Sequence, residues 1–306
     1  MNHIFIDGSY YIFYRYHALK VWWRNAKQED LDDPFENEEF LEKFKSTFIS
    51  KINEIPKKIK VSDYKKGNFK IYVGKDCPRK EIWRMKLHDK YKGNRDGEEG
   101  SLAEKEGKII KKFFKYVYDN NLFNQANVSL ILKMNNLEAD DCIALYIKNL
   151  LKYDNNDKNI KYFEENFGYI KNTNNDLDTP KIHETKNKDN VYIITSDADY
   201  LQLVDENITI YNLKFKNIAL GKNCFQDKNK NLFYKIVMGD KSDNIPPIFP
   251  RCGIKTIEKY FNDKDLFGKK KNEKEEYQKQ YLLNTRLISF NCIPIELQES
   301  FKNLYF

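Results

Sequence analysis

The stretch VYIITSDADYLQL, residues 191–203, decides the fold of this chain of 306 residues. Its first five residues are mostly apolar and β-branched, which predicts a buried strand. The strand leads directly into Asp197 and Asp199, two carboxylates at the carboxyl end of a strand, where open α/β sheets bind their ligands. Such a pair can hold a hard cation such as Mg²⁺, although aspartate is also an ordinary capping and turn residue. The choice between these interpretations depends on whether carboxylates also follow other strands.

Carboxylates do follow three more of the predicted strands. Short apolar runs predict strands at residues 3–6, 68–73, 128–132 and 207–211. Asp7 follows the first of them and Asp76 the second, and a cluster of three acidic residues follows the third: Glu138, Asp140 and Asp141. Three carboxylates within four residues exceed what capping a helix requires, and packed together they would raise one another's pKa. A divalent cation is the simplest way to stabilise them.

Helical spacing of apolar residues predicts helices at 10–19, 38–55 and 101–118, and another that ends near residue 150. Residues 152–190 are rich in Asn, Lys and Asp, and we interpret them as a long, partly ordered insertion.

The character of the chain changes at residue 232, so we divide it into regions 1–231 and 232–306. The second region begins with a short predicted helix, followed by residues 239–244, which contain Asp240 and Asp243. A Pro/Gly-rich turn then leads to a second helix that starts near residue 255. Such a pair binds a nucleic-acid backbone through N–H groups at a helix N-terminus, or is an ordinary helical hairpin. The rest of the region is expected to be helical, with a lysine-rich connector at 269–274.

Charge favours an anionic partner. The net charge is +7, and residues 79–115 hold 12 basic and 7 acidic side chains with interleaved aromatics. That stretch is either a solvated face of mixed charge or an element that grips phosphates. If all nine acidic residues named above converged, the rest of the chain would carry about +16, since the whole carries +7. An acidic pocket in a basic protein suits hydrolysis of nucleic acid by two Mg²⁺ or Mn²⁺ ions.

Other classes of site have little support. The five cysteines are scattered without a CxxC pair, which argues against a disulfide framework or zinc site and for a reducing, intracellular compartment. No stretch has the length and apolarity of a membrane span, and the N-terminus lacks the basic region of a signal peptide. A phosphate-binding P-loop is absent, and no histidine stands in the context of a catalytic triad.

Five segments, in order, resemble the 5′-nuclease (flap endonuclease) superfamily: IFIDGSYYIFYRYHAL, KYKGNR, LEADDCIALYI, YIITSDADYLQLV and MGDKSDNIPP. The chain looks most like the 5′–3′ exonuclease domain of bacterial DNA polymerase I and the phage RNase H/flap endonucleases. The resemblance runs from Asp7 to about residue 261. It implies an α/β fold with a PIN-like, mostly parallel sheet flanked by helices, and a helical arch at about residues 77–118. It also implies a helix–three-turn–helix (H3TH) element that binds DNA, in region 232–306.

The resemblance implies two metal regions that together bind two Mg²⁺ or Mn²⁺ ions. The first would comprise Asp7, Asp76, Glu138, Asp140 and Asp141, and the second Asp197, Asp199, Asp240 and Asp243.

The resemblance also implies contacts to nucleic acid. Lys92 and Arg84 would contact the scissile phosphate at the base of the arch. The further contacts would come from Arg95, from Arg15 in the first helix, and from Gly253, Lys255 and Thr256 in the H3TH turn. In relatives this turn often binds K⁺, whereas here prolines and the pair Arg251-Cys252 replace some of the usual glycines.

The implied function is that of a divalent-metal-dependent, structure-selective 5′-nuclease, a 5′–3′ exonuclease or flap endonuclease of DNA replication and repair. Its substrates would be DNA with a 5′ flap, nick or 5′ end, including RNA primers in RNA/DNA hybrids, and it would act as a monomer. Two alternatives stay open: a junction-resolving or RNA-directed nuclease of the same superfamily, and a catalytically inactive DNA-binding relative. All nine acidic positions are retained, which disfavours the inactive relative.

Overall fold

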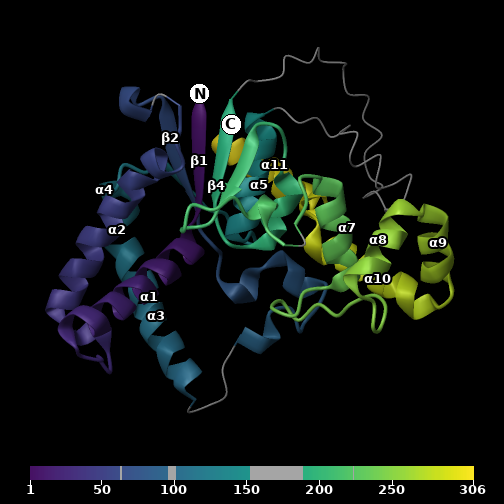
Figure 1. The fold of residues 1–306 in the computed structure, drawn as a ribbon, viewed down its shortest axis with the longest axis horizontal. Helices are drawn as coiled ribbons and strands as arrows, with labels where there is room; N and C mark the ends of the chain where they lie inside the picture. The colour runs from purple at the N-terminus through teal and green to yellow at the C-terminus, as the bar shows by residue number, and fades with distance from the viewer. Residues whose placement is uncertain (63, 96–100, 152–188, 223) are drawn as a thin grey trace.

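A five-stranded parallel sheet forms the centre of the molecule (Figure 1). The computed structural model describes residues 1–62, 64–95, 101–151, 189–222 and 224–306. The strand order is β3-β2-β1-β4-β5, and every one of these neighbouring pairs is parallel. The strands are β1 Asn2–Asp7, β2 Phe69–Gly74, β3 Leu130–Leu132, β4 Asn190–Ile194 and β5 Ile208–Tyr211. The five predicted strands and the parallel sheet are confirmed.

Helices cover both faces of the sheet because side chains alternate along each strand. Ile4 and Ile6 of β1 belong to the core on one face, and Phe5 belongs to the core on the other. The first face packs against α1 Gly8–Lys27, α2 Glu38–Lys58, α3 Leu102–Asp119 and the short α4 Leu122–Gln125. The second face packs against α5 Ala139–Leu150 and α11 Ile295–Tyr305. Figure 1 shows α1 to α4 on one side of the strands and α5 with α11 on the other.

The helix α1 is longer than predicted at its C-terminal end. Its second half is polar in part, but Trp23 is buried against the core and extends the packed face to a last turn that contains Arg24 and Lys27. The helix ends at Gln28, which takes a left-handed conformation with φ 54°.

The expected arch is described in two parts. Residues 79–95 form short 3₁₀ turns and α3 follows them, while residues 96–100 lie outside the described part. Residues 152–188 of the insertion predicted at 152–190 also lie outside it, and of the last two residues Asn190 already belongs to β4. The 3₁₀ turns in the described residues are η1 Pro34–Glu36, η2 Tyr64–Lys66, η3 Arg79–Glu81, η4 Trp83–Lys86, η5 Gly93–Arg95, η6 Ala198–Leu203, η7 Ile218–Leu220 and η8 Phe290–Cys292.

Four helices near the C-terminus enclose a core of their own, with Phe233, Phe249 and Tyr281 inside it. They are α7 Lys228–Met238, α8 Ile254–Asn262, α9 Lys264–Asn272 and α10 Glu275–Ile288. The predicted helix pair is confirmed as α7 and α8. The predicted connector at 269–274 is wrong in its first part, because α9 continues to Asn272.

The boundary placed at residue 232 falls inside α7, and α11 returns to pack on α5. The division into two regions stays a prediction. Among the described helices, none combines the length and the apolarity that crossing a membrane requires.

Candidate active site

The acidic residues meet where the strand order reverses. The chain proceeds from β1 through β2 to β3 in one direction and then returns to β4 and β5 on the other side of β1. Ligands of open parallel sheets bind at this switch point, beyond the carboxyl ends of the strands. Asp7 ends β1, Asp197 follows β4, and a cavity of about 930 Å³ opens between them. Carboxylates and ammonium groups line it: Asp7, Asp76, Lys92, Glu138, Asp140, Asp197, Lys235 and Asp240.

Asp7 and Asp76 are held by hydrogen bonds at the ends of β1 and β2. Asp7 caps α1 by accepting from the N–H of Tyr10 at 3.0 Å, and it accepts from the hydroxyl of Thr195 at 3.2 Å. Asp76 accepts from the N–H of Ala139 at 2.8 Å and from the hydroxyl of Ser9. Burial raises the pKa of Asp7 to about 7, and the charges of Asp76 and Asp197 act in the same direction. The surroundings of Asp7 therefore disfavour its ionised form unless a cation lies nearby.

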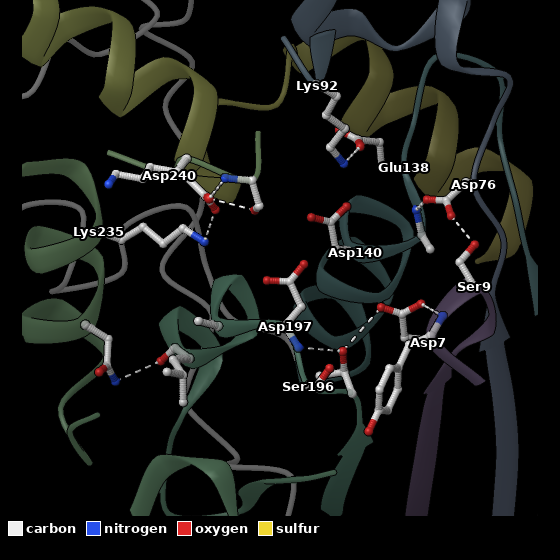
Figure 2. A pocket seen from close by; sticks show the side chains of 18 of the residues that line it. Asp7, Ser9, Asp76, Lys92, Glu138, Asp140, Ser196, Asp197, Lys235 and Asp240 are labelled. Atoms are coloured by element: carbon white, nitrogen blue, oxygen red, sulfur yellow. Dashed lines mark hydrogen bonds and ion pairs between the residues drawn. The ribbon is translucent and has the colours of Figure 1, made fainter. Parts of the chain in front are cut away.

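Glu138 and Asp140 lie at the start of α5 in different environments. Glu138 accepts from the Lys92 ammonium, from Arg84 at 2.9 Å and from the Tyr91 hydroxyl at 3.0 Å. Burial alone would raise the pKa of Glu138, but Lys92 and Arg84 outweigh it and lower the pKa. Burial, reinforced by Asp141 and Glu138, raises the pKa of Asp140 well above its ordinary value. Figure 2 shows the Asp140 and Asp197 carboxylates projecting into the same space.

Arg84 and Asp141 form a buried ion pair rather than part of the cavity wall. The Arg84 side chain is 2% exposed and that of Asp141 is 0% exposed. Nη1 and Nη2 of Arg84 each donate to one carboxylate oxygen of Asp141, both at 2.7 Å. The Arg84 Nε donates to the carbonyl of Leu287 at 2.7 Å, and the Trp83 indole donates to Asp141 at 3.0 Å. Neither Arg84 nor Asp141 lines the cavity. The phosphate contact of Arg84 therefore stays a prediction that the structure disfavours, because the guanidinium is buried and each of its three nitrogens already donates to another group.

A second acidic group, formed by Asp199, Asp240 and Asp243, binds a lysine that the sequence reasoning missed. The Lys235 ammonium, from α7, forms ion pairs with Asp199 and, at 2.7 Å, with Asp240. Burial alone would raise the pKa of Asp240, but Lys235 and two hydrogen bonds from Ser242 lower it to about 2. Burial raises the pKa of Asp199 to about 7 in spite of Lys235. Lys235 stands in the lysine-rich segment KNKNLFYKIVM, where nothing in the pattern distinguishes it.

Asp243, the third member of this group, lies next to the turn that carries Lys92. The Asp243 side chain accepts from the Tyr91 hydroxyl at 3.1 Å and lies 3.8 Å from the Lys92 ammonium. Lys92 itself adopts a left-handed backbone with φ 56°, which is unfavourable for a residue with a side chain. Two hydrogen bonds stabilise this backbone: its N–H donates to the Asp243 carbonyl at 2.9 Å, and its carbonyl accepts from Arg79 at 2.5 Å. Arg79, which begins the basic stretch 79–115 but has no predicted role of its own there, lines the cavity.

The predicted nucleic-acid contacts fall in different places. Arg15 is half-buried and does not line the cavity; its charge acts on Tyr11, whose hydroxyl donates to the Phe48 carbonyl on α2. Gly253 is the N-cap residue of α8. The other two residues predicted in this turn, Lys255 and Thr256, are exposed and follow Ile254, which lines the cavity. The side chain of Arg95 lies outside the described part. The roles of these residues stay predictions.

The donor sets fit hard divalent cations. Carboxylate oxygens of Glu138, Asp140 and Asp141 lie within 4.8 Å of one another, as do those of Asp199, Asp240 and Asp243. Both groups offer only oxygen, the ligand type that Mg²⁺ and Mn²⁺ prefer, with no thiol or imidazole among them. Because Asp141 is bound to Arg84, the atoms of the first group that face the cavity belong to Glu138 and Asp140.

No protein-family model matches the chain. Two curated relatives match part of it, both named 5′–3′ exonuclease. The protein of Buchnera aphidicola subsp. Acyrthosiphon pisum (strain APS) is 34% identical over 92 residues, which cover 27% of this chain and 32% of the relative. That of Buchnera aphidicola subsp. Schizaphis graminum (strain Sg) is 34% identical over 87 residues, covering 26% and 30%. The chain thus matches about a third of the length of each relative.

Solved structures match the whole chain. The bacteriophage T5 D15 protein crystallised with metal ions has a TM-score of 0.59 at 17% identity, covering 99% of this chain and 97% of that one. The T5 D15 flap endonuclease in a pseudo-enzyme–product complex with DNA and metal ions has a TM-score of 0.61 at 15% identity, with the same coverage. At identities this low, the structural likeness establishes the fold alone. This chain therefore has the fold of the T5 flap endonuclease and shares a segment of sequence with bacterial 5′–3′ exonucleases, which confirms its resemblance to the 5′-nuclease superfamily.

Proposed function

We propose that this chain is a divalent-metal-dependent 5′-nuclease that hydrolyses phosphodiester bonds of DNA. One observation carries the proposal: acidic residues from the ends of β1, β2 and β4, and from the start of α5, line one cavity together with ammonium groups. Carboxylates are suited to metal ions, and ammonium groups to phosphates. The relatives named 5′–3′ exonuclease and the neighbouring structures with DNA and metal ions support this chemistry.

Two Mg²⁺ or Mn²⁺ ions would be held at the two acidic groups, Glu138 and Asp140 at the first and Asp199 and Asp240 at the second. Asp7, Asp76 and Asp197 line the cavity together with Glu138, Asp140 and Asp240, and they would complete the sets, directly or through water. When bound, such ions make water a better nucleophile and stabilise the attacking and leaving oxygens of the phosphodiester. Asp141 would act indirectly, because its ion pair with Arg84 holds the first turn of α5 in place.

Lys92 would contact the phosphate that is cleaved. Its ammonium lies at the cavity on the Glu138 carboxylate, and its backbone is held on both sides by hydrogen bonds to Asp243 and Arg79. A phosphate near Glu138 would therefore meet a positioned positive charge. The amino end of α8 borders the cavity through Ile254, so its exposed first turn would hold the duplex backbone close to the site.

The finer assignments belong to this proposal as well. Substrates would be DNA with a 5′ flap, nick or 5′ end, and RNA primers paired with DNA. The enzyme would act as a monomer, and K⁺ would bind at the turn before α8.

A panel of substrates tests the proposal: 5′-flap, nicked, blunt and four-way-junction DNA, together with single-stranded RNA, each 5′-labelled and incubated with Mg²⁺. Preferential cleavage of the flap and nicked DNA is the expected result. Preference for the four-way junction or for RNA would favour the alternative nucleases. Duplex binding without cleavage of any substrate would favour the inactive DNA-binding relative.

A further inference from the structure

The Lys235 ammonium occupies the place where the second acidic group would hold its cation. It lies between carboxylates of two different elements, Asp199 in η6 and Asp240 after α7, and its Nζ is 2.7 Å from the Asp240 oxygen. The side chain is only 17% exposed, so water screens these contacts poorly. Figure 2 shows the ammonium turned toward Asp240 at the side of the cavity.

An ammonium and a divalent cation compete for the same oxygens. Asp199, Asp240 and Asp243 form the group whose oxygens lie within 4.8 Å, and Lys235 already binds two of its three members. A divalent cation placed there with the ammonium unmoved would bring like charges within a few ångströms in a poorly screened site. From these contacts we propose that Lys235 is an internal counter-ion, which a divalent cation must displace from Asp199 and Asp240. This inference rests on the proposed function, because it takes the second acidic group to be a metal site.

The first acidic group is arranged differently. Lys92 binds Glu138 there, but within the described part of the chain Asp140 forms no ion pair with a lysine or arginine and faces the cavity. The first cation therefore has an open carboxylate to bind, and the second does not until Lys235 moves. The free protein should bind its two cations in order, with the second weaker. Because Lys235 lines the cavity, a displaced ammonium would be available to a phosphate of the substrate.

Mn²⁺ titration of the full chain without DNA, followed by the paramagnetic resonance signal of the free ion, tests the proposal. In Lys235→Gln the weaker of the two sites should bind Mn²⁺ on the order of tenfold more tightly. This is the change in affinity that corresponds to an electrostatic interaction of about one pKa unit. Lys235→Arg keeps the charge and should bind the second ion as weakly as the wild type. Unchanged or weaker binding of the second ion in Lys235→Gln would overturn the proposal.

Lys230→Gln is the matched control. Lys230 lies on the same helix and is 19% exposed, but its ion-pair partner is Glu258, outside both acidic groups. This variant loses the same charge and should bind both ions as the wild type does. A gain in Lys230→Gln equal to that in Lys235→Gln would show an effect of net charge only and would contradict displacement.

A crystal structure of the wild-type protein soaked in Mn²⁺ gives a second test that does not depend on the folding of a variant. We expect an anomalous peak at Asp199 and Asp240, with the Lys235 ammonium withdrawn from both. A peak there with the pair between Lys235 and Asp240 intact would refute the proposal. If Mn²⁺ binds in the proposed order but no DNA is cleaved, the proposed function fails and displacement stands. If wild type cleaves DNA and Lys235→Gln shows no gain, displacement alone fails.

Discussion

Replacing Arg84 with methionine should lower the stability of the protein, and we do not expect its main effect to be the loss of a contact to the substrate phosphate. Methionine fills similar space but leaves the Asp141 carboxylate, which is 0% exposed, without its two guanidinium hydrogen bonds. It also removes one partner of Glu138 and leaves the Leu287 carbonyl without the Arg84 donor. Breaking a buried pair in this way costs about 3–5 kcal/mol in the free energy of unfolding. At roughly 2–4 °C per kcal/mol, the unfolding midpoint should fall by roughly 6–20 °C.

Urea denaturation and thermal unfolding of the metal-free protein measure this loss. Lys92→Met is the control, because Lys92 lies at the cavity and its loss should reduce cleavage with a smaller change in stability. Adding Asp141→Leu to Arg84→Met should recover part of the stability, because no unpaired carboxylate would then remain at residue 141. An Arg84→Met protein that is as stable as the wild type but cleaves no DNA would refute the reasoning and restore Arg84 to the phosphate.

Three further changes have defined outcomes. Lys92→Ala should lower the rate of cleavage far more than DNA affinity, measured by single-turnover kinetics and by binding in Ca²⁺; a loss confined to binding would exclude Lys92 from the reacting centre. Gly239→Ala should destabilise by at least about 2 kcal/mol, since φ is +67° and the new Cβ would lie 2.4 Å from the Ile245 carbonyl, whereas Gly268→Ala, with open space, should not. Burial lowers the pKa of His3 below 6.5, so the unfolded chain takes up its proton first and stability falls as pH drops below about 6.5. Urea titrations should show a smaller decline for His3→Asn, and parallel declines would contradict this.

Much of the site could be predicted because its residues follow elements with strong sequence patterns. Asp7 ends β1 and Asp197 follows β4 by three residues, both strands are apolar on both faces, and parallel strands carry their carboxyl ends to one edge. Once β1 and β4 are adjacent, these two carboxylates must face one cavity. Asp240 could be placed for a different reason: Gly239 before it and the prolines after it predict a turn.

The remainder depends on how side chains point, which the pattern does not encode. Arg84 stands in a basic stretch that is typical of a surface, yet the turn after Trp83 directs it inward to Asp141. Arg15 shows the same limit, since one position along a helix changes the direction of a side chain by about 100°. The bridge from Lys235 to Asp199 joins two elements far apart in the chain, and no local signal reports such a pair.

The central claim is that the carboxylates at this edge of the sheet hold metal ions for hydrolysis of DNA. The most direct test is cleavage of a 5′-flap DNA in Mg²⁺ and in EDTA by the wild type, Asp140→Asn and Asp197→Asn, with DNA binding measured in Ca²⁺. We predict cleavage by the wild type only with Mg²⁺, and a loss of at least about 100-fold in both variants with DNA binding retained. Wild-type cleavage that persists in EDTA, or variants that cleave as fast as the wild type, would contradict the account.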